Sequence, residues 1–130
     1  MCAVYQDAKA NNRLDKSVVS MSLGASKFKP LDDAVEKLVA EGVAVVVAAG
    51  NNGGDAGATS PASAPNALTV GASDINDARA SFSNYGPVVD VHAPGVDVKS
   101  AWNTGVADYQ SLSGTSMGEF AQEHELCCRN

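Results

Sequence analysis

The sequence has no long hydrophobic run. Its longest, over residues 43–49, is far shorter than the roughly 20 apolar residues that cross a bilayer, which excludes a transmembrane helix. Aromatic residues are scarce, at 5% of the chain, and the three cysteines (Cys2, Cys127 and Cys128) lie near its ends, which gives no disulfide framework. Positive charge is also scarce: 9 Lys and Arg oppose 15 Asp and Glu, and the net charge of −6 argues against nucleic-acid binding.

The remaining composition is that of an ordinary globular protein. The chain has 130 residues, of which 45% are hydrophobic and 18% charged, and this length favours a single domain. Because aromatic residues are few, the core must be built from Val, Ala, Leu and Gly. Residues 1–7 lack the basic and apolar regions of a secretory signal. We therefore expect either an intracellular protein or a chain that begins inside a longer one.

A strand–helix–strand unit is the clearest local pattern. A β-rich run at 18–22 is followed by apolar residues at helical spacing, and 43–49 then predicts a strand that is buried on both faces. The two strands should be parallel and joined by a right-handed crossover. The sequence thus predicts an α/β fold, a mostly parallel sheet with flanking helices. The predicted apolar face of the helix consists of Leu31, Ala34, Val35, Leu38 and Val39.

The other elements give weaker signals. We expect a helix over about 2–11 and further strands at 67–71, 88–91 and 96–98. Residues 55–65, rich in Gly, Ala, Ser and Pro, predict a surface loop, and 111–116 predict a tight turn. The chain must also turn sharply at 50–54, after a buried strand. In open parallel sheets, ligands bind beyond the carboxyl ends of the strands, so this turn is a candidate site.

Three segments could carry chemistry. Ser116 follows Gly114 and Thr115, which can present it on a turn as a nucleophile, although a capping or turn serine would look the same. Asn51 ends a central strand and could donate to a developing oxyanion, or it could be an ordinary loop asparagine. The extended run at 20–24 ends in glycine and could pair with a bound peptide, or it could be a plain strand end.

The order of the short motifs is more informative than any one of them. The chain reads SLG (22–24), AAGN (48–51), TVGAS (69–73), SFSNYG (81–86), APG (93–95) and SGTSM (113–117). This order resembles the subtilases, the subtilisin-like serine proteases of peptidase family S8, and within them the proteinase-K-like enzymes of fungi. The resemblance runs from about residue 3 to residue 117. It implies that the chain is the C-terminal part of a subtilisin-like fold.

The resemblance also implies an activity, that of a serine endopeptidase acting on polypeptides. Ser116 would be the acylating nucleophile, and the Asn51 side chain and the backbone N–H of Ser116 would stabilise the oxyanion. The strand at 22–24 would pair with substrate, and the pocket for the residue before the scissile bond would be a roomy apolar slot. The substrate-binding residues implied in this way are Ser22, Leu23, Gly24, Ala48, Ala49, Gly50 and Thr115.

No cofactor is implied for catalysis, but proteinase-K-like enzymes hold a structural calcium ion. By position, its ligands would be the backbone carbonyls of Pro65 and Ala67 and the carboxylate of Asp90. Oxygen ligands suit this hard cation. The alternative is that Asp90 is structural and accepts hydrogen bonds from loop amides.

The sequence departs from the family pattern upstream of residue 18. The catalytic triad of the family runs Asp, His, Ser along the chain. The DTG-type and HGTH-type motifs that carry the Asp and the His do not occur in this sequence. Its two histidines are His92, at a position that is structural in the family, and His124.

A second departure follows Met117, where the family continues to a Pro-His-Val-Ala-Gly motif. Here Gly118, Glu119 and Phe120 follow, and glutamates cannot be buried unpaired without a large cost. Codons for residues 117–120 can contain GTGAGT, the common start of a spliceosomal intron. We therefore predict a partial subtilase catalytic domain over 1–117 and a non-homologous tail over 118–130, translated from an intron.

By resemblance the function is that of a secreted serine endopeptidase that binds polypeptides and neither nucleic acid nor membrane. Without the catalytic Asp and His, we expect this chain to be inactive. The alternatives are a fragment that binds peptide along 22–24 without cutting it and a product with no function of its own. A partial sheet also has open edges, so we expect this chain alone to be marginally stable or insoluble. The sequence does not indicate an oligomeric state.

Overall fold

The computed structural model describes residues 2–105 and 107–128, with the backbone alone for 2–4 and 125–128. The side chains of the three cysteines therefore lie outside the described part. The helices are α1 (Cys2–Ala10), α2 (Lys29–Ala40) and α3 (Thr115–Cys128), with 3-10 turns η1 (Leu14–Lys16) and η2 (Ala56–Ala58). The strands are β1 (Val18–Met21), β2 (Ala25–Ser26), β3 (Ala44–Ala48), β4 (Thr59–Ser60), β5 (Leu68–Ser73), β6 (Val91–Pro94), β7 (Val98–Ala101) and β8 (Tyr109–Leu112).

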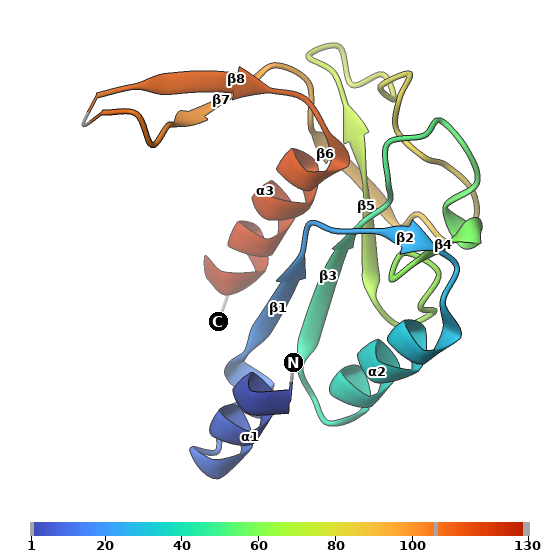
Figure 1. Cartoon of the computed structure of the whole chain (residues 1–130), viewed down its shortest axis with the longest axis vertical. Helices are drawn as coiled ribbons and strands as arrows, with labels where there is room; N and C mark the ends of the chain where they lie inside the picture. Colours follow the sequence, from blue (N-terminus) through green and yellow to red (C-terminus); the bar gives the residue numbers. More distant parts are fainter. Residues whose placement is uncertain (1, 106, 129–130) are drawn as a thin grey trace.

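A parallel sheet forms the centre of the fold. Its strands lie in the order β1-β3-β5-β6, and every neighbouring pair is parallel (Figure 1). The short strands β2 and β4 pair with each other, and β7 and β8 form a separate antiparallel hairpin. The predicted α/β class, with helices flanking a mostly parallel sheet, is confirmed.

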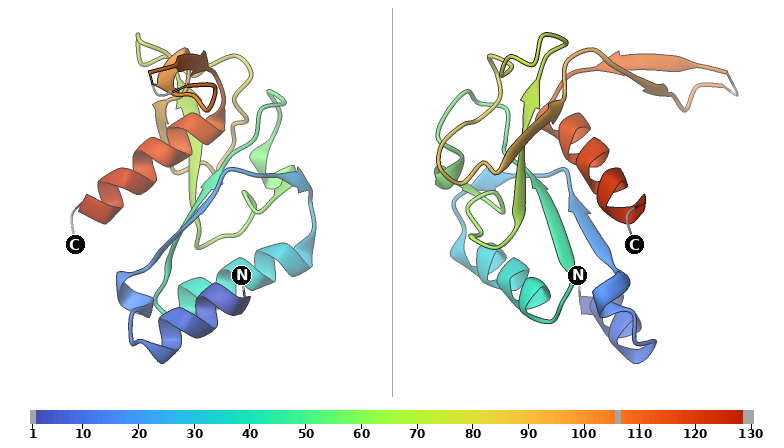
Figure 2. Two further views of the ribbon diagram at one scale, coloured as in Figure 1. Left: turned by 60° about the vertical axis from the view of Figure 1, so that its left-hand side comes forward. Right: turned by 180° about the vertical axis from the view of Figure 1, so that it is seen from behind.

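Helices cover both faces of this sheet. Figure 2 shows α1 and α2 on one side and α3 on the other. Val45 and Val47 of β3 pack in the cluster that includes Val35 and Leu38 of α2. Val46, between them in the sequence, packs in a second cluster with residues of β5 and β6. Side chains alternate along a strand, so a continuous run of valines is what a strand with two buried faces requires.

The sequence of α2 fits this position. Pro30 lies in its first turn, where a missing N–H costs nothing, and Val35 and Leu38 are buried. Gly42 follows the helix with φ of +95°, a conformation that side chains disfavour. The predicted apolar face is therefore confirmed by its packing on β3.

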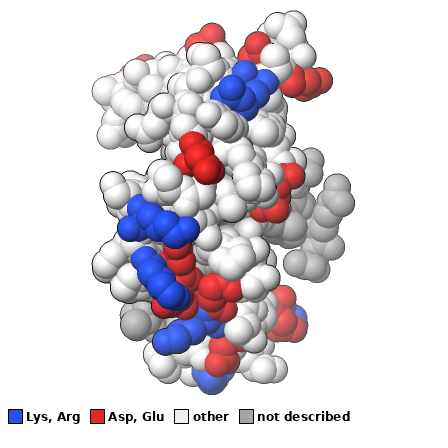
Figure 3. Space-filling view, turned by 90° about the vertical axis from the view of Figure 1, so that its right-hand side faces the viewer, with Lys and Arg blue, Asp and Glu red and all other residues white. Residues whose placement is uncertain are grey.

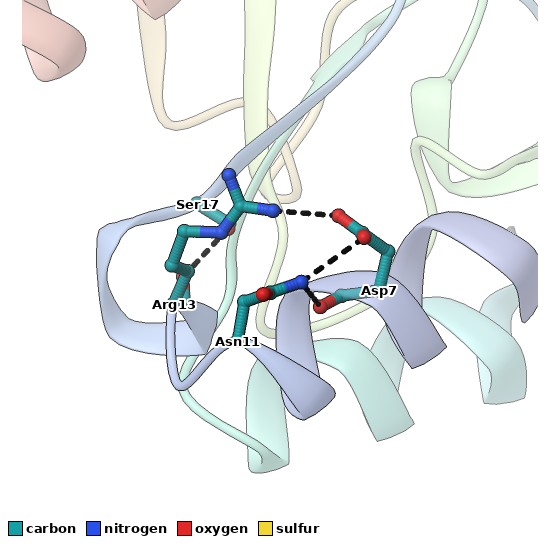
Figure 4. A network of polar contacts seen from close by, with 4 residues as sticks. All are labelled: Asp7, Asn11, Arg13 and Ser17. Atoms are coloured by element: carbon teal, nitrogen blue, oxygen red, sulfur yellow. Dashed lines mark hydrogen bonds and ion pairs between the residues drawn. The ribbon is translucent and has the colours of Figure 1, made fainter.

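The turn between α1 and β1 is closed by side chains (Figure 4). Arg13 contacts the Asp7 carboxylate at 2.6 Å, and the Asn11 amide donates to the backbone carbonyl of Asp7 at 2.8 Å. The Ser17 hydroxyl donates to the carbonyl of Arg13 at 2.6 Å. These contacts are exposed, so they direct the chain into β1 more than they stabilise the fold.

Two predictions about the middle of the chain are wrong. The strand expected at 88–91 lies at Val91–Pro94 instead, because Val88 and Val89 pack on a small cluster of Ala49, Ala56 and Ala62. The surface loop expected over 55–65 contains η2 and β4 and is partly buried, because its alanines pack closely with Ala49, Val88 and Val89. Its buried residues include Ala56, Ser60, Ala62 and Ala64.

Two predictions near the C-terminus also need correction. The strand expected at 96–98 begins at Val98 and forms β7. The turn expected over 111–116 is shorter, because β8 continues to Leu112 and α3 starts at Thr115. The β7–β8 hairpin projects away from the sheet, and all four residues of β8 are exposed.

Helix α3 passes without a break through the boundary predicted at 117/118 and packs on the sheet. A Cβ atom on Gly118 would lie 3.0 Å from the carbonyl oxygens of Gly71 and Ala93, so the helix approaches β5 and β6 closely. Glu119 is fully buried, but it is paired: the hydroxyls of Ser20 and Ser22 both donate to its carboxylate. A glutamate in this place is thus compatible with the fold.

Charged side chains of both signs alternate on the outer surface. Figure 3 shows blue and red atoms side by side over the lower half of the face that lies to the right in Figure 1. One such pair joins Lys29 to Asp33, one turn apart on α2, at 2.5 Å. Within the described residues, no helix is both long enough and apolar enough to cross a membrane.

Candidate active site

Ser116 lies in the first turn of α3. The backbone N–H of Gly114 donates to the carbonyl of Gly95 at 2.8 Å, which anchors the chain just before the helix. The N–H of Met117 donates back to Gly114, which closes the turn around Ser116. Ser116 itself is half-buried, so it is held in place and still reachable.

The Asn51 side chain is fixed against the same helix terminus. Both the backbone N–H and the hydroxyl of Thr115 donate to Asn51 Oδ1, at 2.9 and 3.0 Å. Because a backbone N–H can only donate, the oxygen of the Asn51 amide must face Thr115. The Nδ2 group is therefore left to point elsewhere, and it lies 3.6 Å from where a Cβ on Gly114 would be.

Thr115 completes a short ring of hydrogen bonds. Its hydroxyl also accepts from the backbone N–H of Gly50 at 3.2 Å, and the residue has no exposed surface. One buried side chain thus fixes both the Asn51 amide and the backbone before it. Residues 64 positions apart in the sequence are joined in this way.

A cavity of about 610 Å³ opens beside these residues. The Ser22–Gly24 segment, which follows β1, forms one wall, and Leu23 is 54% exposed there. The Ser22 hydroxyl reaches the backbone carbonyl of Ser116 at 3.2 Å, which ties this wall to α3. Of the nine residues predicted for catalysis and substrate binding, all but Ala49 line the cavity: Ser22, Leu23, Gly24, Ala48, Gly50, Asn51, Thr115 and Ser116.

A serine in the first turn of a helix, beside a fixed asparagine amide and an open cavity, is the arrangement expected of an acyl-transfer site. The subtilase family model matches residues 3–118. The chain belongs to the subtilase family.

Its similarity to individual proteins is extensive but partial. It is 60% identical over 107 residues to subtilisin-like protease 2 of Pseudogymnoascus destructans, covering 82% of this chain and 27% of that protein. It is 51% identical over 111 residues to alkaline protease 1 of Aspergillus clavatus, covering 85% of this chain and 28% of that protein. The subtilase chain therefore spans little more than a quarter of the length of these relatives.

A solved structure is also similar. The crystal structure of a cold-adapted subtilisin-like serine proteinase has a TM-score of 0.76 and 47% sequence identity, over 80% of this chain and 37% of that chain. The central sheet and its flanking helices are thus those of a subtilisin-like fold.

The structure places the remaining predicted residues outside the cavity. Ala49 has no exposed surface and packs in the cluster with Ala56 and Ala62. The carboxylate of Asp90 accepts a hydrogen bond from the backbone N–H of Thr69, in β5, at 2.7 Å. Pro65 is exposed, and Ala67 is buried at the start of β5.

Two polar residues of this subtilase were not assigned from the sequence. Glu119 lies one turn beyond Ser116 and bonds to Ser20 and Ser22. Asn84 is 1% exposed and contacts the loop that carries Asn51. Asn84 lies in the SFSNYG motif, which marked it as part of the family pattern. Its hydrogen-bond partners lie 30 to 35 positions away, so the sequence did not indicate its role.

Proposed function

We propose that this subtilase chain carries the nucleophile and the oxyanion donors of a serine endopeptidase. Ser116 Oγ would attack the carbonyl carbon of a peptide bond and form a tetrahedral adduct. The amine product would leave as the acyl-enzyme forms, and water would then release the acyl group. The hydroxyl proton would pass to a general base, a role that we assign to no residue of this chain.

The fixed orientation of Asn51 is the observation that carries this proposal. With Oδ1 bonded to Thr115 by two donors, Nδ2 is available to donate to the oxyanion together with the backbone N–H of Ser116. Donors that are already in place do not have to reorganise as negative charge develops. An asparagine free to rotate would offer its oxygen as often as its nitrogen.

We assign substrate binding to the Ser22–Gly24 wall and the cavity. An extended peptide would pair with the backbone of this exposed segment, and one of its side chains would enter the cavity. The walls contributed by Leu23, Gly24 and Ala48 are apolar and small, which favours a bulky aromatic or aliphatic side chain before the scissile bond.

The test is hydrolysis of a chromogenic peptide anilide by the 130-residue chain, its Ser116→Ala variant and a matched Ser111→Ala variant. Ser111 is exposed in β8, so its replacement controls for the loss of a serine hydroxyl. Because no residue of this chain is assigned as the general base, we expect at most slow turnover, which Ser116→Ala removes and Ser111→Ala leaves unchanged. Turnover that survives Ser116→Ala would overturn the proposal.

A second candidate function is peptide binding without cleavage. The exposure of Leu23 beside an open cavity favours it, because neither feature depends on a general base. Saturable binding of an extended peptide, measured by fluorescence anisotropy in a chain that shows no turnover, would support this second function.

We further propose that the natural protein is extracellular and that calcium stabilises it through Asp90 and the carbonyls of Pro65 and Ala67. The donor set is all oxygen, which fits the cation, although one Asp90 oxygen is already bonded to Thr69. Calcium should raise the melting temperature of the chain and leave that of Asp90→Asn unchanged. An equal rise in both would contradict this assignment.

A further inference from the structure

The Asn84 side chain makes its hydrogen bonds to the loop that follows β3. Its Nδ2 donates to the carbonyl of Ala49 at 2.9 Å, and its Oδ1 accepts from the backbone N–H groups of Asn52 and Gly54 at 3.0 and 3.1 Å. Its own backbone N–H donates to the carbonyl of Gly50 at 2.9 Å. One buried residue thus bonds to the chain on both sides of Asn51.

The loop is shaped to receive this side chain. Gly50 has φ of +103°, and a Cβ atom there would lie 2.4 Å from Asn84 Nδ2, which no real contact permits. Gly53, with φ of +63°, donates its N–H to the carbonyl of Phe82 at 2.8 Å. Both glycines are needed because the 50–54 loop wraps closely around residues 82–84.

The chemistry of the contacts requires an amide. A carboxylate could accept from Asn52 and Gly54, but it could not donate to Ala49 and would face that carbonyl with a negative charge. A serine hydroxyl would be too short to reach both sides of the loop. Among neutral residues of this size, asparagine places its N–H donors and its acceptor oxygen on two separate atoms, so it can bond to both sides of the loop.

Asn51 is therefore held from two directions. Asn84 bonds to the backbone of the residues before and after Asn51, and Thr115 bonds to the Asn51 side chain. An oxyanion donor is effective only within a few tenths of an ångström of its best position, so the backbone that carries it must be equally well placed.

We propose that Asn84 is a positioning residue for the oxyanion donor Asn51. The inference rests on the role proposed for Asn51, and it assigns Asn84 no contact with substrate. Loss of the Asn84 amide should therefore displace the Asn51 amide and lower turnover without weakening peptide binding.

The first test needs no turnover. We would record the side-chain amide signals of Asn51 by ¹⁵N NMR in the 130-residue chain, in Asn84→Asp and Asn84→Ser, and in the matched control Asn103→Ser. Asn103 is exposed between β7 and β8. We expect the Asn51 signals to shift in both Asn84 variants while the amide signals of β3 stay in place, and to stay unchanged in the control. Unshifted Asn51 signals in folded Asn84 variants would overturn the proposal.

The second test is a double-mutant cycle with Asn51→Ala in the peptide anilide assay. Asn84→Ser should lower kcat on the order of 10- to 100-fold, with KM changed less than about twofold, a smaller loss than deletion of the donor itself. In the Asn51→Ala background, the same substitution should change kcat less than about threefold. Equal losses in both backgrounds would mean a merely structural role.

The two tests separate the failure of this inference from the failure of the proposed function. If Asn51→Ala leaves turnover unchanged, the oxyanion role fails, and the NMR signals still decide whether Asn84 positions Asn51. If Asn51→Ala lowers turnover and the Asn84 variants do not, only the inference about Asn84 is overturned.

Discussion

The central sheet and the β7–β8 hairpin differ in what stabilises them. Strands β3 and β5 are buried on both faces, and Val46, Val47 and Val70 have no exposed surface. Every residue of β8 is exposed, and Lys99 stacks on the Tyr109 ring 5.0 Å away, in the open. Packing fixes the sheet, whereas the hairpin depends mainly on its own backbone ladder.

The proposed active site lies where these two regions meet. Ser113, directly after β8, accepts from the backbone N–H of Asp97 at 2.9 Å, and Gly114 bonds to Gly95. The base of the hairpin is thus anchored beside Ser116 while its strands extend outward. We therefore expect changes in the sheet to affect folding, changes at the junction to affect chemistry, and changes in the hairpin to affect neither.

The largest effect should come from a charge in the sheet. Val46→Asp would bury an unpaired carboxylate under α3, at a cost of at least about 4 kcal/mol, and most domains have only about 5–15 kcal/mol in total. We expect loss of the cooperative urea transition followed by circular dichroism. Ser111→Asp in the hairpin should unfold in urea as the parent does. If both variants lose the transition equally, the sheet and the hairpin do not differ in their effect on folding.

At the junction, Asn51→Ala should leave folding intact and lower kcat. Removing one oxyanion donor costs about 10²–10³ in kcat in enzymes of this mechanism, a magnitude established for a subtilisin itself. Peptide anilide kinetics check this, with the exposed Asn103→Ala as control. A loss expressed in KM alone would show that Asn51 binds substrate and does not act on the transition state.

The next effect should come from Glu119→Ala, which we expect to lower the free energy of unfolding moderately. It opens a cavity under α3 and removes the acceptor shared by Ser20 and Ser22, at a cost of about 1–3 kcal/mol. Glu119→Gln keeps the shape and one acceptor oxygen, and the second hydroxyl can turn to accept from the amide NH2, so it should cost less. Urea denaturation measures both. If the Gln variant is as unstable as the Ala variant, the negative charge of Glu119 matters more than its hydrogen bonds to Ser20 and Ser22.

The smallest effect should come from the outer surface, at the Lys9–Glu41 pair. The hydrogen bond from Lys9, at 3.2 Å, lowers the pKa of the Glu41 carboxyl below its ordinary value of 4.5. The pair therefore stabilises the fold above that value, and the contribution disappears as the pH falls through the lowered pKa. The melting temperature of Glu41→Gln should be slightly below that of the parent at pH 7 and 10 mM salt, and equal to it at pH 2.5. If the difference in melting temperature persists at pH 2.5, it does not come from the Lys9–Glu41 pair.

The sequence predicted the parts of this molecule that depend on local pattern. The helical spacing of Val35 and Leu38 and the valine run of β3 each report a buried face directly. The order of the motifs predicted, through the family resemblance, that Ser116 and Asn51 share one site, and both residues line the same cavity.

The failures occurred where distant contacts decide. Val88 and Val89 look like a strand, but they pack on alanines near residue 56, and those alanines look like a loop until the valines cover them. The role of Asn84 depends on backbone groups of a loop some 30 residues earlier, and its own neighbours in the sequence do not indicate them. Glu119 looked incompatible with a core because its partners, Ser20 and Ser22, lie 99 and 97 positions away.

The distance in sequence between Glu119 and its partners Ser20 and Ser22 also determines when this contact can form during synthesis. Strand β1 is made early, but the hydroxyls of Ser20 and Ser22 meet their acceptor only once α3 has been made. At about 5–20 residues per second, one face of the growing sheet stays uncovered for several seconds. Helix α3 is thus the element that shields β1, β3, β5 and β6 from contact with other chains.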